Sequence, residues 1–209
     1  MKILVSPGVG EYEEKKSRFI AHLASVSTEE EAVAFFDEMK KKYWDARHNC
    51  TAFVLGEDAN LTRCSDDGEP SGTAGKPILN VLLHSEIRNI ACVVTRYFGG
   101  TLLGTGGLIK AYSDAVSRAI ENSEIAIQIK GIRIPFTIDY EIYSKVVSEF
   151  ERNGFTLKDA VFTDKVKASV EADPKQKEKI KEILTRISCG KAVFDEEEEC
   201  IIRTKADME

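Results

Sequence analysis

Three short stretches in the first half of the chain carry the side chains best suited to chemistry. His48 titrates near neutral pH, so it can accept or donate a proton under physiological conditions. A polar stretch further on contains Asp66, Asp67 and Glu69, whose carboxylates can act as bases or as oxygen ligands. Arg96 offers a planar fork that binds carboxylate or phosphate groups. The candidate catalytic residues are therefore His48, Asp66, Asp67 and Glu69.

The segment 99–107 holds five of the fourteen glycines of the chain. Glycine loses more conformational freedom on folding than any other residue, so five together indicate positive φ angles or close approach by another group. The segment lies between a β-branched run and an amphipathic run, which predicts a strand, a loop and a helix. Unpaired N–H groups at the start of a helix favour anions. The candidate ligand-binding residues are Thr73, Lys76, Arg96, Gly99, Gly100, Gly104, Gly106, Gly107 and Lys110.

Neither standard nucleotide-binding template fits this segment. A P-loop requires a lysine directly after its second glycine, where this chain has Thr105 after Gly104. The dinucleotide pattern requires a glycine three positions after Gly106, where this chain has Ile109. The spacing alone leaves a ligand-binding loop and a purely structural turn equally open.

Each chemical interpretation has a structural alternative. Asp66, Asp67 and Gly68 form an ordinary turn sequence, and a single histidine without a metal partner is more often structural. Arg96 can pair with Asp66 or Glu69 and hold two loops together. No nucleophile, base and orienting group can be recognised together. Since there is also no metal-ligand spacing and no cofactor motif, we expect no metal and no cofactor.

The elements that must position these residues follow an α+β pattern in the first half. Thr28 and Glu31 form a capping box for a helix whose apolar stripe is Val33, Phe36, Met39 or Lys40, and Tyr43. Tyr97 and Phe98 could stack on bases, but the end of a buried strand favours a core position for both. We expect extended segments at 17–26, 49–55, 61–64 and 89–98, a loop at 65–77, a helix from Ile78 to about Ser85, and a helix with Leu108, Ala111, Tyr112, Ala115, Val116, Ala119 and Ile120 on its buried stripe.

The second half has a regular β-α-β-β-α-β pattern, which is typical of a ferredoxin-like fold with two helices on one face of an antiparallel sheet. We therefore expect one domain at 1–123 and another at 124–209. The expected elements are a strand at 125–138, a helix with a stripe from Tyr140 to Phe150, a hairpin at 154–171, a helix after Pro174 and a closing strand at 191–203. No cluster in this half suggests catalysis.

The charge of the chain limits the classes of function. Residues 1–123 carry 14 Lys and Arg against 17 Asp and Glu, and residues 124–209 carry 15 against 18, so each half has a net charge of −3. Global attraction to nucleic acid is therefore not implied. The lysines between 165 and 181 and the acidic run 195–199 are expected to be solvated faces.

The five cysteines are odd in number and widely spaced, which predicts reduced and mostly buried thiols. Cys64 borders the polar loop, and we expect it to be a small apolar residue at a strand end rather than a reactive thiol. No apolar run approaches about 18 residues and the start is too short for a signal peptide, so we expect a cytoplasmic protein.

Three motifs occur in order in the first half. They are the segments 44–50 and 65–79 and the residues of 96–112 that include Arg96-Tyr97-Phe98-Gly99-Gly100, Leu103–Leu108 and Ala111-Tyr112. With a fourth, shorter match at Ser17-Arg18-Phe19, these motifs resemble those of the YigZ/IMPACT family and cover nearly all of residues 15–123. The second half resembles the additional C-terminal domain of the bacterial members, which is similar to a domain of elongation factor G.

The resemblance implies that the first domain has the fold of domain two of a small-subunit ribosomal protein. The eukaryotic relatives restrain a translation-initiation-factor kinase through a separate N-terminal domain, for which this chain has no room before Ser17, so we do not expect that partner. For bacterial members the resemblance implies nucleic-acid or ribosome binding. The chain departs from the family at Thr101-Leu102, where an Ile/Val-Lys pair is common, and at Lys110, where arginine is common.

We therefore expect a translation-linked regulatory or binding protein that contacts RNA or the ribosome through the face carrying the motifs. One alternative is an enzyme for a phosphorylated or carboxylated small molecule, with the glycine-rich segment as anion cradle and His48 and Asp67 as acid and base. Another is a protein-interaction regulator in which the motifs serve only structure. The expected partners are RNA, the ribosome or an anionic small molecule but no membrane, and we expect a monomer or weak homo-oligomer.

Overall fold

The computed structural model describes residues 1–205, so residues 206–209 at the end of the predicted second domain lie outside the described residues. The chain forms two compact units, here called the first unit (Met1–Ile127) and the second unit (Gln128–Thr204). The boundary predicted at 123/124 falls at the start of strand β8, Glu124–Ile138, whereas the division into units falls within that strand. No helix in residues 1–205 is long and apolar enough to cross a membrane.

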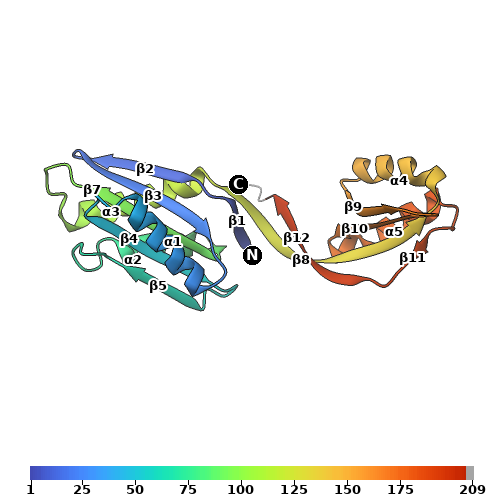
Figure 1. The fold of residues 1–209 in the computed structure, drawn as a ribbon, viewed down its shortest axis with the longest axis horizontal. Coiled ribbons are helices and arrows are strands. Elements are labelled where there is room, and N and C mark those ends of the chain that lie inside the picture. Colours follow the sequence, from blue (N-terminus) through green and yellow to red (C-terminus); the bar gives the residue numbers. More distant parts are fainter. Residues whose placement is uncertain (206–209) are drawn as a thin grey trace. The chain divides into compact units, whose positions relative to one another are not determined.

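The first unit is an α+β layer structure, as predicted (Figure 1). Its main sheet has the order β2-β3-β7-β4-β5, and all neighbours in it are antiparallel. Helix α1 packs on one face, while α2 and α3 cover the other. The elements are β1 Lys2–Ser6, β2 Val9–Glu14, β3 Ser17–Ser25, α1 Glu29–Lys42, β4 His48–Leu55, β5 Leu61–Ser65, α2 Gly75–His84, β6 Ile87–Arg88, β7 Ile90–Tyr97 and α3 Gly104–Glu121.

Strand β7 lies at the centre of this sheet, and every residue from Ile90 to Arg96 is buried. The prediction of a strand buried on both faces is confirmed. On α3, the predicted stripe is also confirmed, because its residues from Leu108 to Ala119 are buried against the sheet and only Ile120 is partly exposed. The strand and the helix thus provide a packed scaffold for the segment between them.

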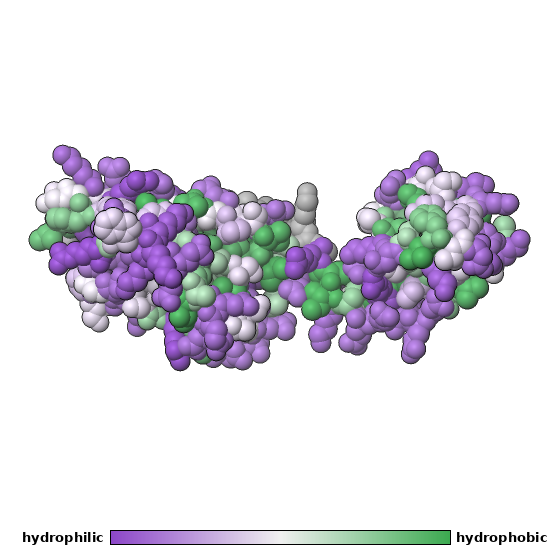
Figure 2. All heavy atoms as spheres, in the orientation of Figure 1, coloured by the Kyte–Doolittle hydropathy of each residue, from purple (hydrophilic) through white to green (hydrophobic). Residues whose placement is uncertain are grey.

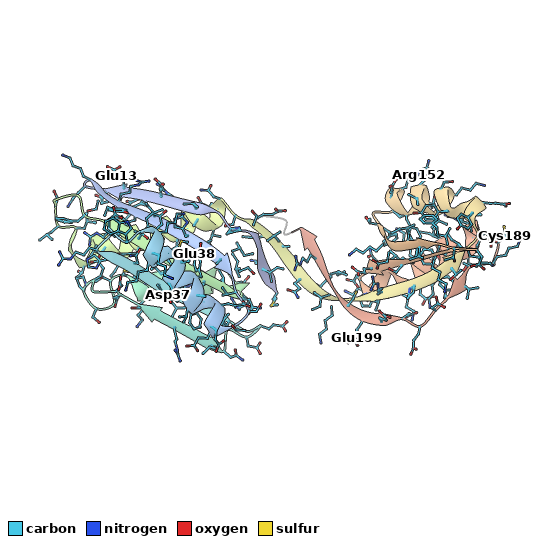
Figure 3. All side chains as sticks on the ribbon, viewed as in Figure 1. Glu13, Asp37, Glu38, Arg152, Cys189 and Glu199 are labelled. Carbon is cyan, nitrogen blue, oxygen red and sulfur yellow. The ribbon has the colours of Figure 1, made fainter. Side chains whose placement is uncertain are left out.

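Helix α1 begins with the predicted Thr28 cap. Thr28 Oγ1 accepts a hydrogen bond from Glu31 N at 3.2 Å. Glu31 Oε2 accepts one from Ser27 N at 2.6 Å, one residue before the backbone N–H that a capping box uses. Of the predicted stripe, Met39 is buried and Phe36 and Tyr43 are partly buried, but Val33 is 46% exposed. The opposite face of the helix is acidic, with Asp37 and Glu38 extending away from the sheet (Figure 3).

Two helices start earlier than predicted. Helix α2 begins at Gly75 rather than Ile78, so the polar loop is confined to residues 66–74. Helix α3 begins at Gly104, which places Gly104, Gly106 and Gly107 in its first turn rather than in a loop. Strands β1 and β2 lie before Ser17, where the sequence patterns predicted no element.

Four connections leave the main sheet at the same end, which we call the loop end. Strand pairing joins Glu14 to Ser17, and the neighbouring strand pairs place His48 opposite Arg96. The loop end therefore carries the β2–β3 turn, the α1–β4 connection, the polar loop 66–74 and the β7–α3 loop 98–103. Glu13, beside the β2–β3 turn, is labelled at this end in Figure 3.

The second unit has the predicted ferredoxin-like order. The strands pair as β11-β8-β10-β9 with every neighbour antiparallel, and α4 and α5 contribute to one core with the sheet. The predicted closing strand 191–203 is instead divided into two strands, of two and eight residues. The elements after β8 are α4 Tyr140–Arg152, β9 Leu157–Phe162, β10 Val166–Ala172, a 3₁₀ turn Pro174–Gln176, α5 Lys177–Ile187, β11 Val193–Phe194 and β12 Glu198–Lys205.

Two lysines of the lysine cluster form ion pairs with the acidic run of the second unit. Glu197 Oε2 lies 2.8 Å from Lys177 Nζ, and Glu197 Oε1 lies 2.6 Å from Lys181 Nζ. Both lysines belong to α5, so this helix carries less free positive charge than its sequence suggests.

Candidate functional site

The centre of the candidate site is a buried ion pair near the end of β7. Arg96 Nη1 lies 2.6 Å from Glu69 Oε1, and the two side chains are only 7% and 3% exposed. Tyr112 of α3 donates a hydrogen bond to the same carboxylate oxygen at 2.9 Å. The pair therefore joins β7, the polar loop and α3. This is one of the two ion pairs that the sequence left open for Arg96.

Aromatic rings enclose the guanidinium group of Arg96. The Phe19 ring lies 5.4 Å from its central carbon and the Phe98 ring 5.6 Å, distances that allow cation–π attraction. Its Nε is buried and has no hydrogen-bond partner within residues 1–205. Arg96 therefore forms a buried ion pair, and its guanidinium group is not available to a ligand in solvent.

Cys50 extends this cluster toward the polar loop. Its Sγ lies 3.3 Å from Tyr112 Oη and 3.0 Å from the backbone oxygen of Asp66. Burial raises the pKa of the Cys50 thiol to about 12, and burial likewise raises the pKa of Tyr112 above its ordinary value. Both groups stay protonated at neutral pH, so neither is an activated nucleophile.

Asp66 folds the polar loop around its own carboxylate. Oδ1 accepts hydrogen bonds from Ala74 N at 3.0 Å and Gly75 N at 2.8 Å, and Oδ2 accepts one from Gly72 N at 2.8 Å. Burial raises the pKa of this carboxyl, but the three backbone donors outweigh it and hold the pKa below its usual value. Asp66 thus occupies the N-terminus of α2 as an internal anion.

Asp67 and His48 form a second contact between the polar loop and β4. Asp67 Oδ2 accepts a hydrogen bond from Asn49 N at 2.7 Å, and the Asp67 carbonyl lies 2.9 Å from His48 Nδ1. Because a carbonyl can only accept, Nδ1 carries the proton in this contact. In neutral His48 the free lone pair is therefore on Nε2, which has no hydrogen bond within the described part of the chain.

The β7–α3 loop begins with a close backbone contact. Gly99 N donates a hydrogen bond to Ser17 Oγ at 3.0 Å. A Cβ on Gly99 would lie 2.1 Å from the carbonyl carbon of Lys16, so no side chain fits there. Further along, Gly104 and Gly106 are exposed and a Cβ on either would meet open space. The start of α3 is therefore accessible, and it has no side-chain cap and no acidic residue in its first turn.

The side chains of three remaining ligand-binding candidates, Thr73, Lys76 and Lys110, form no hydrogen bond or ion pair with this cluster among the described residues. Thr73 is buried, and its hydroxyl donates to the Pro70 carbonyl at 2.6 Å. Lys110 pairs with Asp114 at 2.8 Å and also contacts Tyr12 Oη at 3.0 Å. Lys76 is exposed in the first turn of α2. The structure thus brings His48, Asp66, Asp67, Glu69 and Arg96 together, while Lys110 pairs elsewhere and Lys76 is exposed.

Two expectations about side chains near the site were wrong. Phe98 is 56% exposed rather than part of the core, because β7 ends at Tyr97. Cys64 is exposed on the edge strand β5 rather than buried. The five cysteines are free, but only Cys50 and Cys92 are buried. Among residues 1–205, no group of three or more His, Cys, Asp or Glu side chains could hold a metal ion.

Two large hydrophobic side chains of the loop end are strongly exposed and were not among the predicted site residues. Trp44 is 82% exposed and Leu102 is 83% exposed. Lys15 and Lys16 form the β2–β3 turn with φ angles of 46° and 67°, a left-handed conformation that lysine rarely adopts. The two-residue gap between Glu14 and Ser17 would have signalled such a turn if β2 had been recognised.

Comparisons with known proteins give one consistent result. The family described as "Impact N-terminal domain" matches residues 15–120, and "Domain of unknown function (DUF1949)" matches residues 136–191. "IMPACT family member YvyE" of Bacillus subtilis (strain 168) is 41% identical over 185 residues, which cover 88% of this chain and 85% of that protein. "IMPACT family member YigZ" of Escherichia coli (strain K12) is 45% identical over 131 residues, which cover 62% and 63%.

A solved structure also resembles the whole chain. It is titled "Crystal structure of an hypothetical protein", is 32% identical in sequence and has a TM-score of 0.59. The match covers 92% of this chain and 95% of that one. Both units are therefore present together in a protein of known structure.

Proposed function

This chain belongs to the IMPACT family, and we propose that it is a translation-linked binding protein that contacts RNA or the ribosome through the loop end of its first unit. The observation that carries the proposal is the combination of free cations and exposed apolar side chains at that end. Lys15, Lys16 and Arg47 are exposed there, and none has an ion pair within the described residues. Trp44 and Phe98 provide exposed rings beside them.

Such a combination suits a single-stranded nucleic acid. Bases stack on aromatic faces, while lysine and arginine follow the phosphate backbone. Figure 2 shows apolar atoms in green at the left end of the first unit, surrounded by hydrophilic atoms. The net charge of the whole chain does not oppose this use, because attraction depends on the local field at the contact.

The carboxylates of the motifs support binding rather than catalysis. Asp66 is held by three backbone N–H groups, and Glu69 by Arg96 and Tyr112. Asp67 holds the backbone of β4. Each acid therefore has a structural role within the first unit.

The experiment compares two triple variants of the full chain. Lys15→Gln/Lys16→Gln/Arg47→Gln removes the free cations of the loop end, and Lys130→Gln/Lys145→Gln/Lys191→Gln removes three exposed lysines of the second unit as a matched control. Binding to a fluorescent single-stranded RNA and to purified ribosomes is measured from 50 to 300 mM salt. Removing three phosphate contacts should lower affinity about tenfold or more and reduce the slope of log K against log salt by about 2.

Equal losses in both triple variants would contradict the proposal, as would the absence of ribosome co-sedimentation at low salt. We also propose that the chain is cytoplasmic and that it is a monomer or a weak homo-oligomer. Sedimentation of the free chain checks its oligomeric state.

A second candidate function is an enzyme that uses His48 as a base on an anionic small molecule. The favouring observation is the contact of Nδ1 with the Asp67 carbonyl, which leaves Nε2 with the free lone pair. Metabolites bearing phosphate or carboxylate groups would be tested by thermal shift and turnover. His48→Gln should keep the fold and abolish turnover, and a screen without any thermal shift would eliminate this candidate.

A further inference from the structure

A groove between α2 and α3 extends from Gly72 of the polar loop, and it contains none of the free cations or exposed rings of the loop end. Its volume is about 570 Å³. Its apolar lining, here called the floor, consists of Pro77 and Val81 of α2 and Ile109 and Ile120 of α3. Asn80, His84 and Glu121 also line it. All of these residues belong to the first unit.

Two serines make the α3 side of the groove shallow enough for close approach. Ser113 and Ser117 line it one turn apart, and Ser117 Oγ donates to the Ser113 carbonyl at 3.0 Å. This hydroxyl is therefore already satisfied, so an apolar surface can cover it without leaving an unpaired donor. Small residues at such positions let another helix pack near the backbone of α3.

The two helices that form the groove run in the same general direction. Strands β5 and β7 are both antiparallel to β4, so they are parallel to each other and both end at the loop end. Helices α2 and α3 start there, after the polar loop 66–74 and the β7–α3 loop. Asp66 offsets the N-terminal dipole of α2, whereas α3 has no side-chain cap and no acidic residue in its first turn. The dipole of α3 therefore makes the loop end of the groove more positive than the other end.

The groove is lined by one lysine and one glutamate, which lie at its opposite ends. Lys76 lies in the first turn of α2 and Glu121 in the last turn of α3. Neither side chain has an ion pair within residues 1–205. Both charges are therefore available to an external partner whose own charges complement them.

We propose that this groove binds an amphipathic helix of a partner protein, antiparallel to α2 and α3. From Lys76 to Ser85 the groove is about 14 Å long at 1.5 Å per residue, which corresponds to about two and a half helical turns. The partner helix places an apolar stripe on the floor. It carries Lys or Arg in its N-terminal turns, beside Glu121, and Asp or Glu in its C-terminal turns, beside Lys76. This partner surface is distinct from the proposed RNA contact.

The test uses two synthetic 16-residue helical peptides with the same Leu and Ala stripe and blocked ends. One carries three lysines in its first two turns and three glutamates in its last two, and its twin has these charges exchanged. Fluorescence anisotropy with the full chain measures both affinities. We expect the first peptide to bind at least about tenfold more tightly than its twin, because only it matches both ends of the groove.

A charge-swapped chain provides the decisive comparison. In Lys76→Glu/Glu121→Lys each new charge suits its helix end, so the fold is retained. This variant should prefer the twin peptide. Ser117→Trp, which fills the groove, should abolish binding of either peptide, while Glu38→Trp on the exposed face of α1 should leave it unchanged.

Four results would overturn the proposal. The first three are failure of the full chain to bind either peptide, equal affinity for both peptides, and an unchanged preference in the charge-swapped chain. The fourth is a dimer of the wild-type chain that Ser117→Trp converts to a monomer, since a second copy would then occupy the groove. Lys15→Gln/Lys16→Gln/Arg47→Gln should bind the peptide normally, which separates this proposal from the RNA contact.

Discussion

Arg96 Nη1 lies 2.6 Å from Glu69 Oε1 inside the first unit, where the two side chains are separated by 27 positions in sequence and almost entirely withdrawn from solvent. This pair fixes the polar loop to the central strand. Tyr112 adds α3 to the same point, so three elements depend on one carboxylate. The position of the loop is therefore set by long-range contacts rather than by its own turn sequence.

Glu69→Ala should lower the free energy of unfolding by about 3–5 kcal/mol, because it leaves the Arg96 charge buried and uncompensated. Urea denaturation checks this value. Glu69→Met/Arg96→Met, which removes both charges, should be more stable than Glu69→Ala alone. Glu11 and Arg18 form an exposed pair at 2.9 Å, and Glu11→Ala should cost less than about 1 kcal/mol. Equal losses at both pairs would show that the buried pair has no special role.

Asp66→Asn should destabilise the protein at pH 7 by about 1–2 kcal/mol, because it weakens the cap of α2. The folded pKa of Asp66 is lowered, so its ionised form contributes stability above the unfolded pKa of about 3.9 and loses this contribution as pH falls through the folded pKa. The difference between wild type and variant should therefore shrink below about pH 4. Melting temperatures from pH 7 to pH 2.5 measure it, and a constant difference would contradict the assignment.

Lys15→Asn/Lys16→Gly should raise stability by about 1–2 kcal/mol, since asparagine and glycine adopt left-handed angles at lower cost than lysine. The same change should weaken RNA binding, because two of the three free cations at the loop end are lost. Calorimetry and RNA titration on one preparation test both effects. If the variant gains stability and keeps full RNA affinity, the two lysines are strained but do not contribute to RNA binding.

Gly99→Ala and Gly106→Ala should act in opposite directions. A Cβ at Gly99 meets the Lys16 backbone, so the variant should lose about 1–3 kcal/mol by overpacking. A Cβ at Gly106 meets open space in the first turn of α3, so alanine should add about 0.5–1 kcal/mol. If a ligand approaches the helix start closely, Gly106→Ala loses affinity while gaining stability. Unchanged binding would assign this glycine to structure alone.

Cysteine modification should separate the five thiols by exposure. Cys64 and Cys189 are exposed, whereas Cys50 and Cys92 are buried and burial raises the pKa of both thiols. Iodoacetamide at pH 8 should label the first two in the native chain and all five after unfolding, as read by peptide mass spectrometry. Fast native labelling of Cys50 would show that the cluster around Tyr112 opens readily.

Local patterns in the sequence were sufficient where one element buries one face. The stripe of α3 and the buried strand before it were predicted because their periodicity is uninterrupted from Leu108 to Ala119 and from Ile90 to Arg96. The β-α-β-β-α-β order of the second unit was likewise visible. Strand β2 was missed because its charged residues read as a solvated loop, although it pairs along its whole length with β3.

The site could be predicted only as a set of residues. The sequence placed Asp66 and Glu69 in one loop, but it could not show that Asp66 turns inward and caps α2 from nine positions away. The start of α2 was misplaced for this reason, since Gly75 has no local cap and depends on that carboxylate. Arg96 was likewise open between two partners until β7 and the loop were positioned relative to each other.

The backbone contact between Gly99 and Lys16 has a consequence for the energetics of recognition. With no side chain between them, the β2–β3 turn and the β7–α3 loop are in direct backbone contact. This contact restrains the backbone that carries Lys15, Lys16 and Phe98, so the two loops lose less conformational entropy on association than unconnected loops would. Affinity at this end then depends mainly on the contacts themselves.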